Sequence, residues 1–245
     1  MRKPGWKGRR AAYLHFPREI PIDKKSLRSS AFSHTDRGVF MNKAMTILYK
    51  VHDNLYVNLT NRCPCACTFC VRLSMDTVSA IDGRSLWLER EPSYEEVIAE
   101  FDSYNLQDFK ELVFCGYGEP TERLDVLLAV ARYAKEHFGC RVRVNTNGMA
   151  DLIWGRDTSP DFAGAVDVVS ISLNSPDPVK YQEVVRCRFG ERSFQAMLDF
   201  AKNVRKHVPE VVLTTVETVL SREEEARCAE ICREIGVSYR IRPWE

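Results

Sequence analysis

The chain has 245 residues with a formal net charge of +1, and 44% of its residues are hydrophobic and 28% charged. This composition is ordinary for a globular protein and excludes a collagen-like, low-complexity or strongly charged chain. No apolar run approaches the roughly 18 residues needed to span a bilayer. The near-neutral charge gives no reason to expect a nucleic acid or a membrane surface as an obligatory partner.

Positive charge is concentrated at the start of the chain. Residues 1–40 contain ten Lys or Arg and only three acidic residues. This segment lacks the apolar region, about 7–15 residues long, of a secretory signal. We predict that residues 1–45 form a basic, disordered N-terminal extension and that residues 46–245 form the core domain. A start codon assigned too far upstream, and a basic arm for a partner or nucleic acid, are the alternative interpretations.

Beyond residue 45, short β-rich runs alternate with amphipathic helical stretches. Capping boxes at Ser93 and Ser221 begin two of these helices, Thr121 is predicted to cap a third, and Gly139 ends it. Near-continuous apolar strands separated by helices indicate a parallel sheet covered by helices, either an incomplete (β/α) barrel or an open doubly wound sheet. The predicted strands are Leu55–Thr60, Glu111–Tyr117, Arg141–Asn147, Val166–Asn174, Val211–Thr218 and Val237–Arg242.

Nine cysteines are many for a chain of this length. No signal sequence supports export, so a disulfide framework is not expected. Four of the nine, Cys63, Cys65, Cys67 and Cys70, fall within eight residues. Metal or cluster ligation in a reducing cytoplasm fits this clustering better than disulfides do.

The cysteine-rich loop follows the first predicted strand, where α/β barrels place their chemistry. Cys63, Cys67 and Cys70 have the spacing C-x₃-C-x₂-C, and three thiolates can hold three corners of a cubane cluster. The fourth iron then lacks a local ligand, which is typical of a catalytic site. A structural zinc site and inert buried thiols are the alternatives. Cys65 is interpreted as a bystander.

This loop resembles the C-x₃-C-x-aromatic-C signature of the radical S-adenosylmethionine (SAM) superfamily, with Phe69 as the aromatic residue. The resemblance covers roughly residues 54–245. The stretch Asn54–Cys63 and the compact size also resemble the TatD-associated radical SAM proteins.

The resemblance implies that Cys63, Cys67 and Cys70 bind a [4Fe–4S] cluster and that SAM chelates its fourth iron. It implies reductive cleavage of SAM to a 5′-deoxyadenosyl radical, which abstracts a hydrogen atom from a substrate. Phe69 would pack near the adenine of SAM. The fold class predicted on this basis is α/β, a partial (β/α)6 TIM-type barrel of parallel strands with outer helices.

The second predicted strand runs into Cys115-Gly-Tyr-Gly-Glu119. This stretch resembles the Gly-Gly-Glu motif of the superfamily, with Tyr117 in place of the first of the two adjacent glycines. On that match, Gly118 and Glu119 face the amino group of SAM. A plain strand–turn–helix connection is the alternative.

Polar residues also end the third and fourth predicted strands. Asn147 is a candidate for cofactor binding, or an ordinary turn residue in an Asn-Gly pair. Strand alternation places Ser170, Ser172 and Asn174 on one face, and the resemblance assigns Ser172 and Asn174 to the ribose hydroxyls of SAM.

The remaining candidates carry weaker signals. Arg242 is interpreted as a partner for the SAM carboxylate, for an acidic substrate or for a surface ion pair. Cys228 and Cys232 share a helical face with apolar residues, which favours core packing. Cys115 is either a buried strand thiol or a further functional thiol. The five histidines do not cluster, and no catalytic residue is assigned.

We therefore predict a cytoplasmic radical SAM enzyme that acts on a small molecule, with a flavodoxin or ferredoxin as electron donor. The TatD-associated resemblance adds a possible functional link to a TatD-family protein. The alternatives are a non-catalytic zinc or Fe–S binding module that assists a partner protein, and an activating enzyme that places a glycyl radical on a protein.

Overall fold

The computed structural model describes residues 44–73, 85–217 and 219–243, all of which belong to one unit, Phe40–Glu245. Of the predicted extension, residues 1–45, only Ala44 and Met45 are among them, and Ala44 forms a parallel β-bridge with Leu88. The prediction for residues 1–43 lies outside the described residues.

The described residues form a seven-stranded sheet in which spatial order follows chain order. The first strand pairs antiparallel with the second, and every later pair is parallel. Six consecutive parallel strands with intervening helices confirm the predicted partial TIM-type barrel. The strands are β1 (Leu48–Val51), β2 (Asn54–Val57), β3 (Leu112–Phe114), β4 (Val142–Thr146), β5 (Val168–Ser172), β6 (Glu210–Val216) and β7 (Ser238–Arg242).

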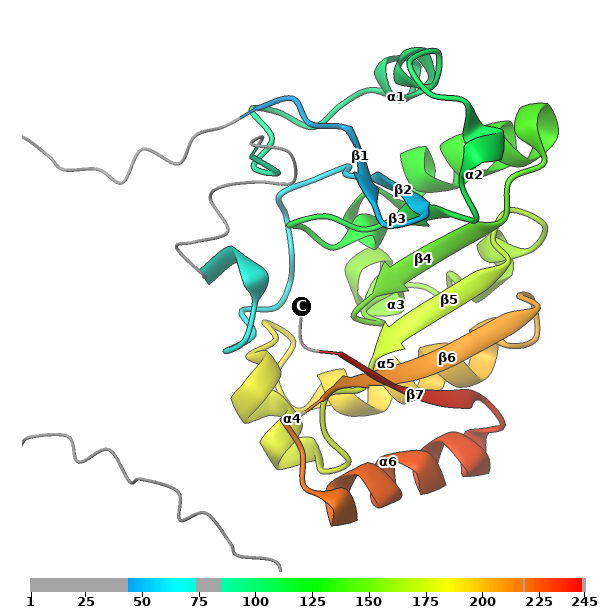
Figure 1. Ribbon diagram of the computed structural model, residues 1–245. Coiled ribbons are helices and arrows are strands. Elements are labelled where there is room, and N and C mark those ends of the chain that lie inside the picture. The colour runs from blue at the N-terminus through cyan, green and yellow to red at the C-terminus, as the bar shows by residue number, and fades with distance from the viewer. Residues whose placement is uncertain (1–43, 74–84, 218, 244–245) are drawn as a thin grey trace, which may run out of the picture. The chain divides into compact units, whose positions relative to one another are not determined.

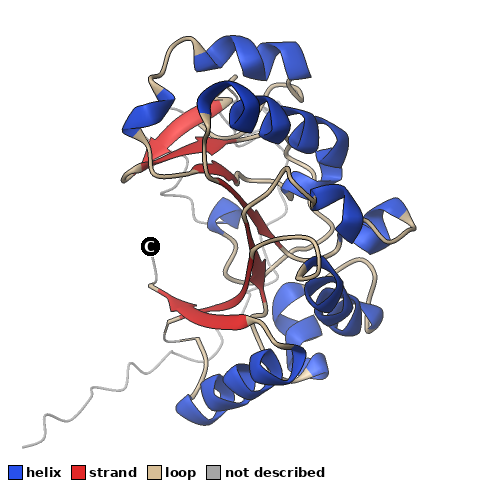
Figure 2. Cartoon of the chain, turned by 90° about the vertical axis from the view of Figure 1, so that its right-hand side faces the viewer, coloured by secondary structure: helices blue, strands red, loops and turns tan. Residues whose placement is uncertain are grey.

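The helices cover one face of the curved sheet and leave its concave face without a helical layer (Figures 1 and 2). The α-helices are α1 (Tyr94–Phe101), α2 (Leu124–Phe138), α3 (Ala150–Trp154), α4 (Pro178–Val185), α5 (Arg192–Val204) and α6 (Arg222–Ile235). Short 3₁₀ helices lie at η1 (Val71–Leu73), η3 (Leu106–Asp108), η4 (Pro120–Arg123) and η5 (Ser159–Phe162).

The helix ends follow local rules at most positions. Ser93 and Ser221 each form a complete capping box, and Gly139 and Gly236 close α2 and α6 in the left-handed conformation. The prediction that Thr121 caps a helix is wrong. A 3₁₀ turn precedes α2, and Thr121 donates its hydroxyl to Glu119 instead.

Alternation along β4 separates the two faces of the sheet. Val142, Val144 and Thr146 are buried, whereas Arg143 and Asn145 are half-buried. Because the buried positions meet the helices, the half-buried ones lie on the concave face. The strand register carries this alternation on to β5, β6 and β7. Each strand therefore contributes polar side chains to the concave face.

We expect Leu127→Ala to lower the free energy of unfolding by about 2–5 kcal/mol, because it leaves a cavity between α2 and the sheet. Leu127 is 0% exposed within the main hydrophobic core. Glu136→Ala on the exposed side of the same helix is the control, with an expected change within about 0.5 kcal/mol. Urea unfolding measures both, and equal effects would contradict this packing.

Candidate functional site

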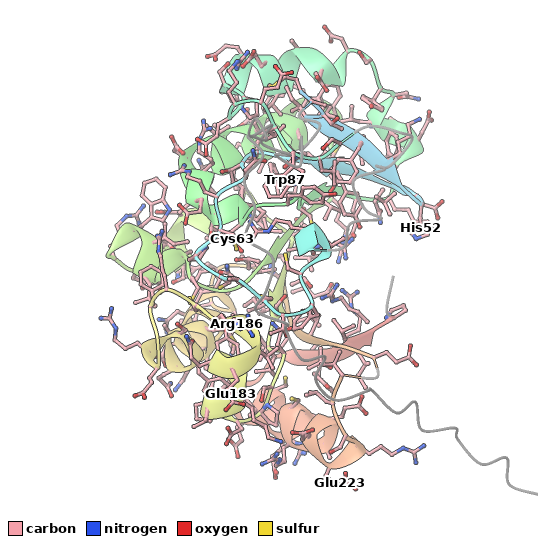
Figure 3. All side chains as sticks on the ribbon, turned by 90° about the vertical axis from the view of Figure 1, so that its left-hand side faces the viewer. His52, Cys63, Trp87, Glu183, Arg186 and Glu223 are labelled. Carbon is pink, nitrogen blue, oxygen red and sulfur yellow. The ribbon has the colours of Figure 1, made fainter. Side chains whose placement is uncertain are left out.

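The cysteine loop is attached by its backbone to the last residues of α4 and to the segment that follows it. Figure 3 shows Cys63 and Arg186, which marks that segment, on the same side of the molecule. These bonds fix the path of the loop without using any thiol. Three hydrogen bonds join the segments: Ala66 N to Val185 O at 3.1 Å, Thr68 N to Val184 O at 2.9 Å and Arg188 N to Pro64 O at 2.8 Å.

The three predicted ligands, Cys63, Cys67 and Cys70, are half-buried. Arg72 Nε donates to Cys70 Sγ at 3.3 Å, and Asn147 Nδ2 donates to Cys63 Sγ at 3.8 Å. Burial raises the pKa of Cys67 to about 12. A cation and an amide directed at the sulfurs stabilise thiolates, the form in which cysteine binds iron. The donor set therefore fits a cluster with three protein ligands.

No three His, Cys, Asp or Glu side chains in the described part of the chain converge closely enough to hold a single metal ion. A cubane cluster asks for a different arrangement, because each thiolate binds its own iron at a separate corner.

Cys65 differs from its three neighbours in where it points. It is 4% exposed and belongs to the main hydrophobic core, where its thiol meets that of Cys187. Asn147 Nδ2 lies 3.5 Å from its sulfur. Hydrogen bonding to Cys187 and Cys63, together with burial, raises the pKa of Cys65 far above its usual value. This placement supports the interpretation of Cys65 as a bystander that anchors the loop.

Glu119 is 4% exposed and links three segments of the chain. Its Oε1 accepts hydrogen bonds from Thr146 Oγ1 at 2.6 Å and from both Thr121 Oγ1 and Thr121 N, at 2.8 and 3.2 Å. Its Oε2 accepts from Asn147 N at 2.8 Å, and its own amide donates to Arg62 O. Burial raises the pKa of Glu119, and these hydrogen bonds act in the opposite direction. Oε2 retains room for a second donor.

Gly118 passes close to the backbone in front of the cysteine loop. A Cβ atom there would lie 2.2 Å from Thr60 O and 2.7 Å from Arg62 O, so only glycine fits. Tyr117 is 7% exposed and packs edge-on against Trp87, with ring centroids 5.1 Å apart. Tyr117, which replaces one glycine of the family motif, thus packs in a separate apolar cluster. It does not interfere with the close contact between Gly118 and the backbone of Thr60 and Arg62.

The ends of β4 and β5 hold the other predicted residues. Asn147 uses its backbone for Glu119 and its side chain for the cysteines. Ser172 is half-buried at the last position of β5, and Phe69 is half-buried in the cysteine loop. The prediction that strand alternation extends to Asn174 is wrong, because β5 ends at Ser172 and Asn174 adopts φ 60°. Asn174 Oδ1 is buried and has no hydrogen-bond partner within the described parts of the chain.

Sequence reasoning missed a group of ion pairs beside the loop. Glu122, whose side chain is 5% exposed, lies 3.6 Å from Arg62 Nη1 and 3.4 Å from Arg188 Nη2. Arg62 immediately precedes Cys63, and Arg188 immediately follows Cys187. Glu122 therefore holds both ends of the junction between the cysteine loop and the segment after α4. Arg72, two residues after Cys70, was detectable as a cation beside the predicted ligands.

A family model of the radical SAM superfamily matches residues 57–235. The chain therefore belongs to the radical SAM superfamily, a superfamily of enzymes whose members bind a [4Fe–4S] cluster and SAM. No curated protein matches the sequence.

Solved structures share the fold at low sequence identity. A radical SAM methyltransferase from Sphaerobacter thermophilus has a TM-score of 0.57 and 17% identity, covering 80% of this chain and 57% of that one. Streptococcus suis SuiB bound to its precursor peptide SuiA has a TM-score of 0.54 and 14% identity, covering 79% and 39%. Native anSMEcpe with bound AdoMet has a TM-score of 0.54 and 17% identity, covering 77% and 50%. The chain thus spans between about two fifths and three fifths of these proteins.

The described helices include none that is both long and apolar enough to cross a membrane.

We expect Gly118→Ala to lower the iron and sulfide content of anaerobically reconstituted protein, because the new Cβ displaces the backbone before Cys63 at a cost of about 1–3 kcal/mol. Gly164→Ala is the control. Gly164 has φ +71° but open space around its Cβ position, so that variant introduces backbone strain away from the loop. A Gly118→Ala protein with full cluster content would contradict the close approach.

We expect Glu122→Gln to speed anaerobic loss of iron to a chelator, because this buried carboxylate pairs with both Arg62 and Arg188 at the loop junction. Arg62 keeps a second partner, Glu91 at 2.7 Å, so the effect comes mainly through Arg188. The loss in stability should be about 1 kcal/mol, between an exposed pair and a fully buried one. Glu183→Gln, an exposed substitution on α4, matches the charge change. Identical release rates in the two variants would show that the ion pairs do not hold the loop.

Proposed function

We propose that this chain is a radical SAM enzyme in which Cys63, Cys67 and Cys70 hold a [4Fe–4S] cluster. When bound, the cluster and SAM supply reductive cleavage of SAM to a 5′-deoxyadenosyl radical, for hydrogen abstraction from a small-molecule substrate. One observation carries the proposal. Asn147 contacts both Cys63 through its side chain and Glu119 through its backbone, which joins two motifs that lie far apart in the sequence.

The chain's own residues have distinct tasks in this proposal. Arg72 and Asn147 direct donors at the cysteine sulfurs and favour thiolates. Gly118 lets the end of β3 lie against the backbone before Cys63, and Glu119 Oε2 offers an acceptor to an ammonium group of SAM. Phe69, Ser172 and Asn174 are proposed to contact the adenosine part of SAM. The buried acceptor Asn174 Oδ1, which has no partner among the described residues, suits a hydroxyl donor.

The principal alternative is a non-catalytic zinc or Fe–S module that assists a partner protein. A tetrahedral zinc site with four cysteines would need Cys65 as the fourth ligand, and Cys65 is instead part of the hydrophobic core. Metal analysis of protein purified without oxygen separates the enzyme from a zinc module, and release of 5′-deoxyadenosine separates it from a non-catalytic Fe–S module. About four iron and four sulfide per chain support the enzyme, whereas stoichiometric zinc supports the module.

The proposal extends to partners. Radical SAM enzymes act on small-molecule or peptide substrates and take electrons from a donor protein. We propose a flavodoxin or ferredoxin as that donor and a cytoplasmic location. The stretch Asn54–Cys63 supports the narrower resemblance to the TatD-associated radical SAM proteins, and with it a functional link to a TatD-family protein.

We expect Cys63→Ala, Cys67→Ala and Cys70→Ala each to abolish the cluster and the release of 5′-deoxyadenosine from SAM and dithionite. Cys65→Ala is the matched control and should keep both, with a loss of stability from the core. Iron and sulfide analysis and chromatography of the nucleoside products measure the outcome. Wild-type protein with an intact cluster that releases no 5′-deoxyadenosine would refute the enzymatic function.

A further inference from the structure

Two arginines lie on the concave face of the sheet at its β7 edge. Arg240 and Arg242 lie two residues apart on β7, so they point to the same side of the strand. Ile241, which lies between the two arginines, and Tyr239, which precedes them, point to the opposite face of the sheet. Tyr239 bonds Thr215 at 2.7 Å and reaches Cys228 of α6, on the helical side. Arg240 and Arg242 therefore face the concave side.

The sheet register places polar side chains beside these arginines. Arg240 is opposite Thr214, Thr214 is opposite Ser172, and Ser170 is opposite Asn145. In this register, Ser170, Ser172, Thr214 and Arg240 point to the same face of the sheet as Arg143 and Asn145 of β4, which is the concave face. Neighbouring parallel strands lie about 4.8 Å apart, so the hydroxyls form a continuous row from β5 to the arginines. This row lies on the concave face, on the side of the sheet opposite the layer formed by the described α-helices (Figure 2).

At the amino-terminal end of this face, two acidic residues pair with arginines. Glu111 pairs with Arg143 at 3.0 Å and with Arg141 at 3.1 Å, and Glu210 pairs with Arg141 at 2.7 Å. Two acidic and two basic groups thus balance there. Within the described chain, Arg240 forms no ion pair.

The charge of Arg242 acts on a thiol on the other side of the concave face. Burial and, to a lesser extent, the charge of Glu119 raise the pKa of the Cys115 thiol. The hydrogen bond from Asn145 and the positive charges of Arg242 and Arg143 act on this pKa in the opposite direction. Cys115 follows β3, so the charge of Arg242 on β7 is felt across the concavity. Asn145 hydrogen-bonds Cys115, and its buried Oδ1 has no hydrogen-bond partner among the residues that the structure describes. A buried acceptor of this kind calls for an N–H or O–H donor.

We propose that this face binds an organic anion, with its carboxylate or phosphate held by Arg240 and Arg242 and a hydroxyl or amino group directed at Asn145. The proposal rests on the proposed function, since it names the substrate class of the same enzyme. Guanidinium groups match carboxylate and phosphate oxygens in charge and geometry, and the hydroxyls of Ser170 and Thr214 lie beside them in the register of the sheet.

The test uses three matched probes on anaerobically reconstituted holoenzyme at constant ionic strength: glycerate, glycerol phosphate and neutral glycerol. A ligand that binds the folded state raises the thermal unfolding midpoint in a concentration-dependent way. We expect glycerate, glycerol phosphate or both to raise it, and glycerol to have no effect. The two anions distinguish a carboxylate from a phosphate substrate. Equal responses to all three probes, or none, would overturn the proposal.

The double variant Arg240→Gln/Arg242→Gln should weaken anion binding by roughly tenfold or more, as loss of charge-assisted contacts predicts. The control Arg227→Gln/Arg233→Gln removes the same charge from exposed positions of α6, and should bind as the wild type does. Arg240→Lys/Arg242→Lys keeps the charge and should restore part of the affinity. Unchanged anion binding in the Gln variant would refute the proposal.

The affinity for SAM is measured in the same variants by equilibrium dialysis. A loss of SAM affinity equal to the loss of anion affinity would assign the arginines to the carboxylate of SAM and overturn the proposal. Thermal shifts do not depend on turnover. Failure of anion binding is therefore distinguishable from failure of the enzymatic function, which appears as absent cluster or absent 5′-deoxyadenosine in wild-type protein.

Discussion

The rest of the site depends on the burial of the Glu119 carboxylate. A buried carboxylate is costly unless donors surround it, and here they come from Thr121, Thr146 and the Asn147 backbone. Satisfying them fixes the end of β4 against the end of β3. The amide of Glu119 binds Arg62 O and brings the start of the cysteine loop to the same place. One desolvated group thus sets the relative positions of the elements from which the site is built.

The cysteine loop combines a rigid backbone with thiols that are free to serve as ligands. Its backbone bonds to the last residues of α4 and to the segment after it, and the Cys65 side chain enters the core. Glu122 adds ion pairs on both sides of the junction. Since these contacts do not use Cys63, Cys67 or Cys70, the loop can be held in place without competing for the sulfurs. A site on a preorganised loop binds its group with less loss of conformational entropy.

The two faces of the sheet divide the work between stability and chemistry. The convex face is apolar and covered by helices, so it supplies the hydrophobic driving force for folding. The concave face carries polar residues in the register of β4 to β7, among them the buried Ser170 and Thr214. Its amino-terminal end holds balanced ion pairs, and its β7 edge carries Arg240 and Arg242. This asymmetry orients an anion relative to the cysteine loop, which lies beyond the carboxyl end of β2.

The sequence by itself determined the six parallel strands, the two capping boxes, the three ligand cysteines as candidates and the superfamily, because these depend on local spacing and hydrophobic period. The hairpin strand β1, the 3₁₀ turn before α2 and the left-handed Asn174 were not predicted from the sequence, although β1 pairs with the adjacent β2 and Glu119 accepts from Thr121 only two residues away. Only the tertiary structure showed that Cys65 enters the core, that Asn147 joins Cys63 to Glu119, and that Glu122 lies between Arg62 and Arg188. These contacts form only when the ends of separate strands come together at one edge of the sheet, and the spacing of residues in the sequence does not predict which of them will touch.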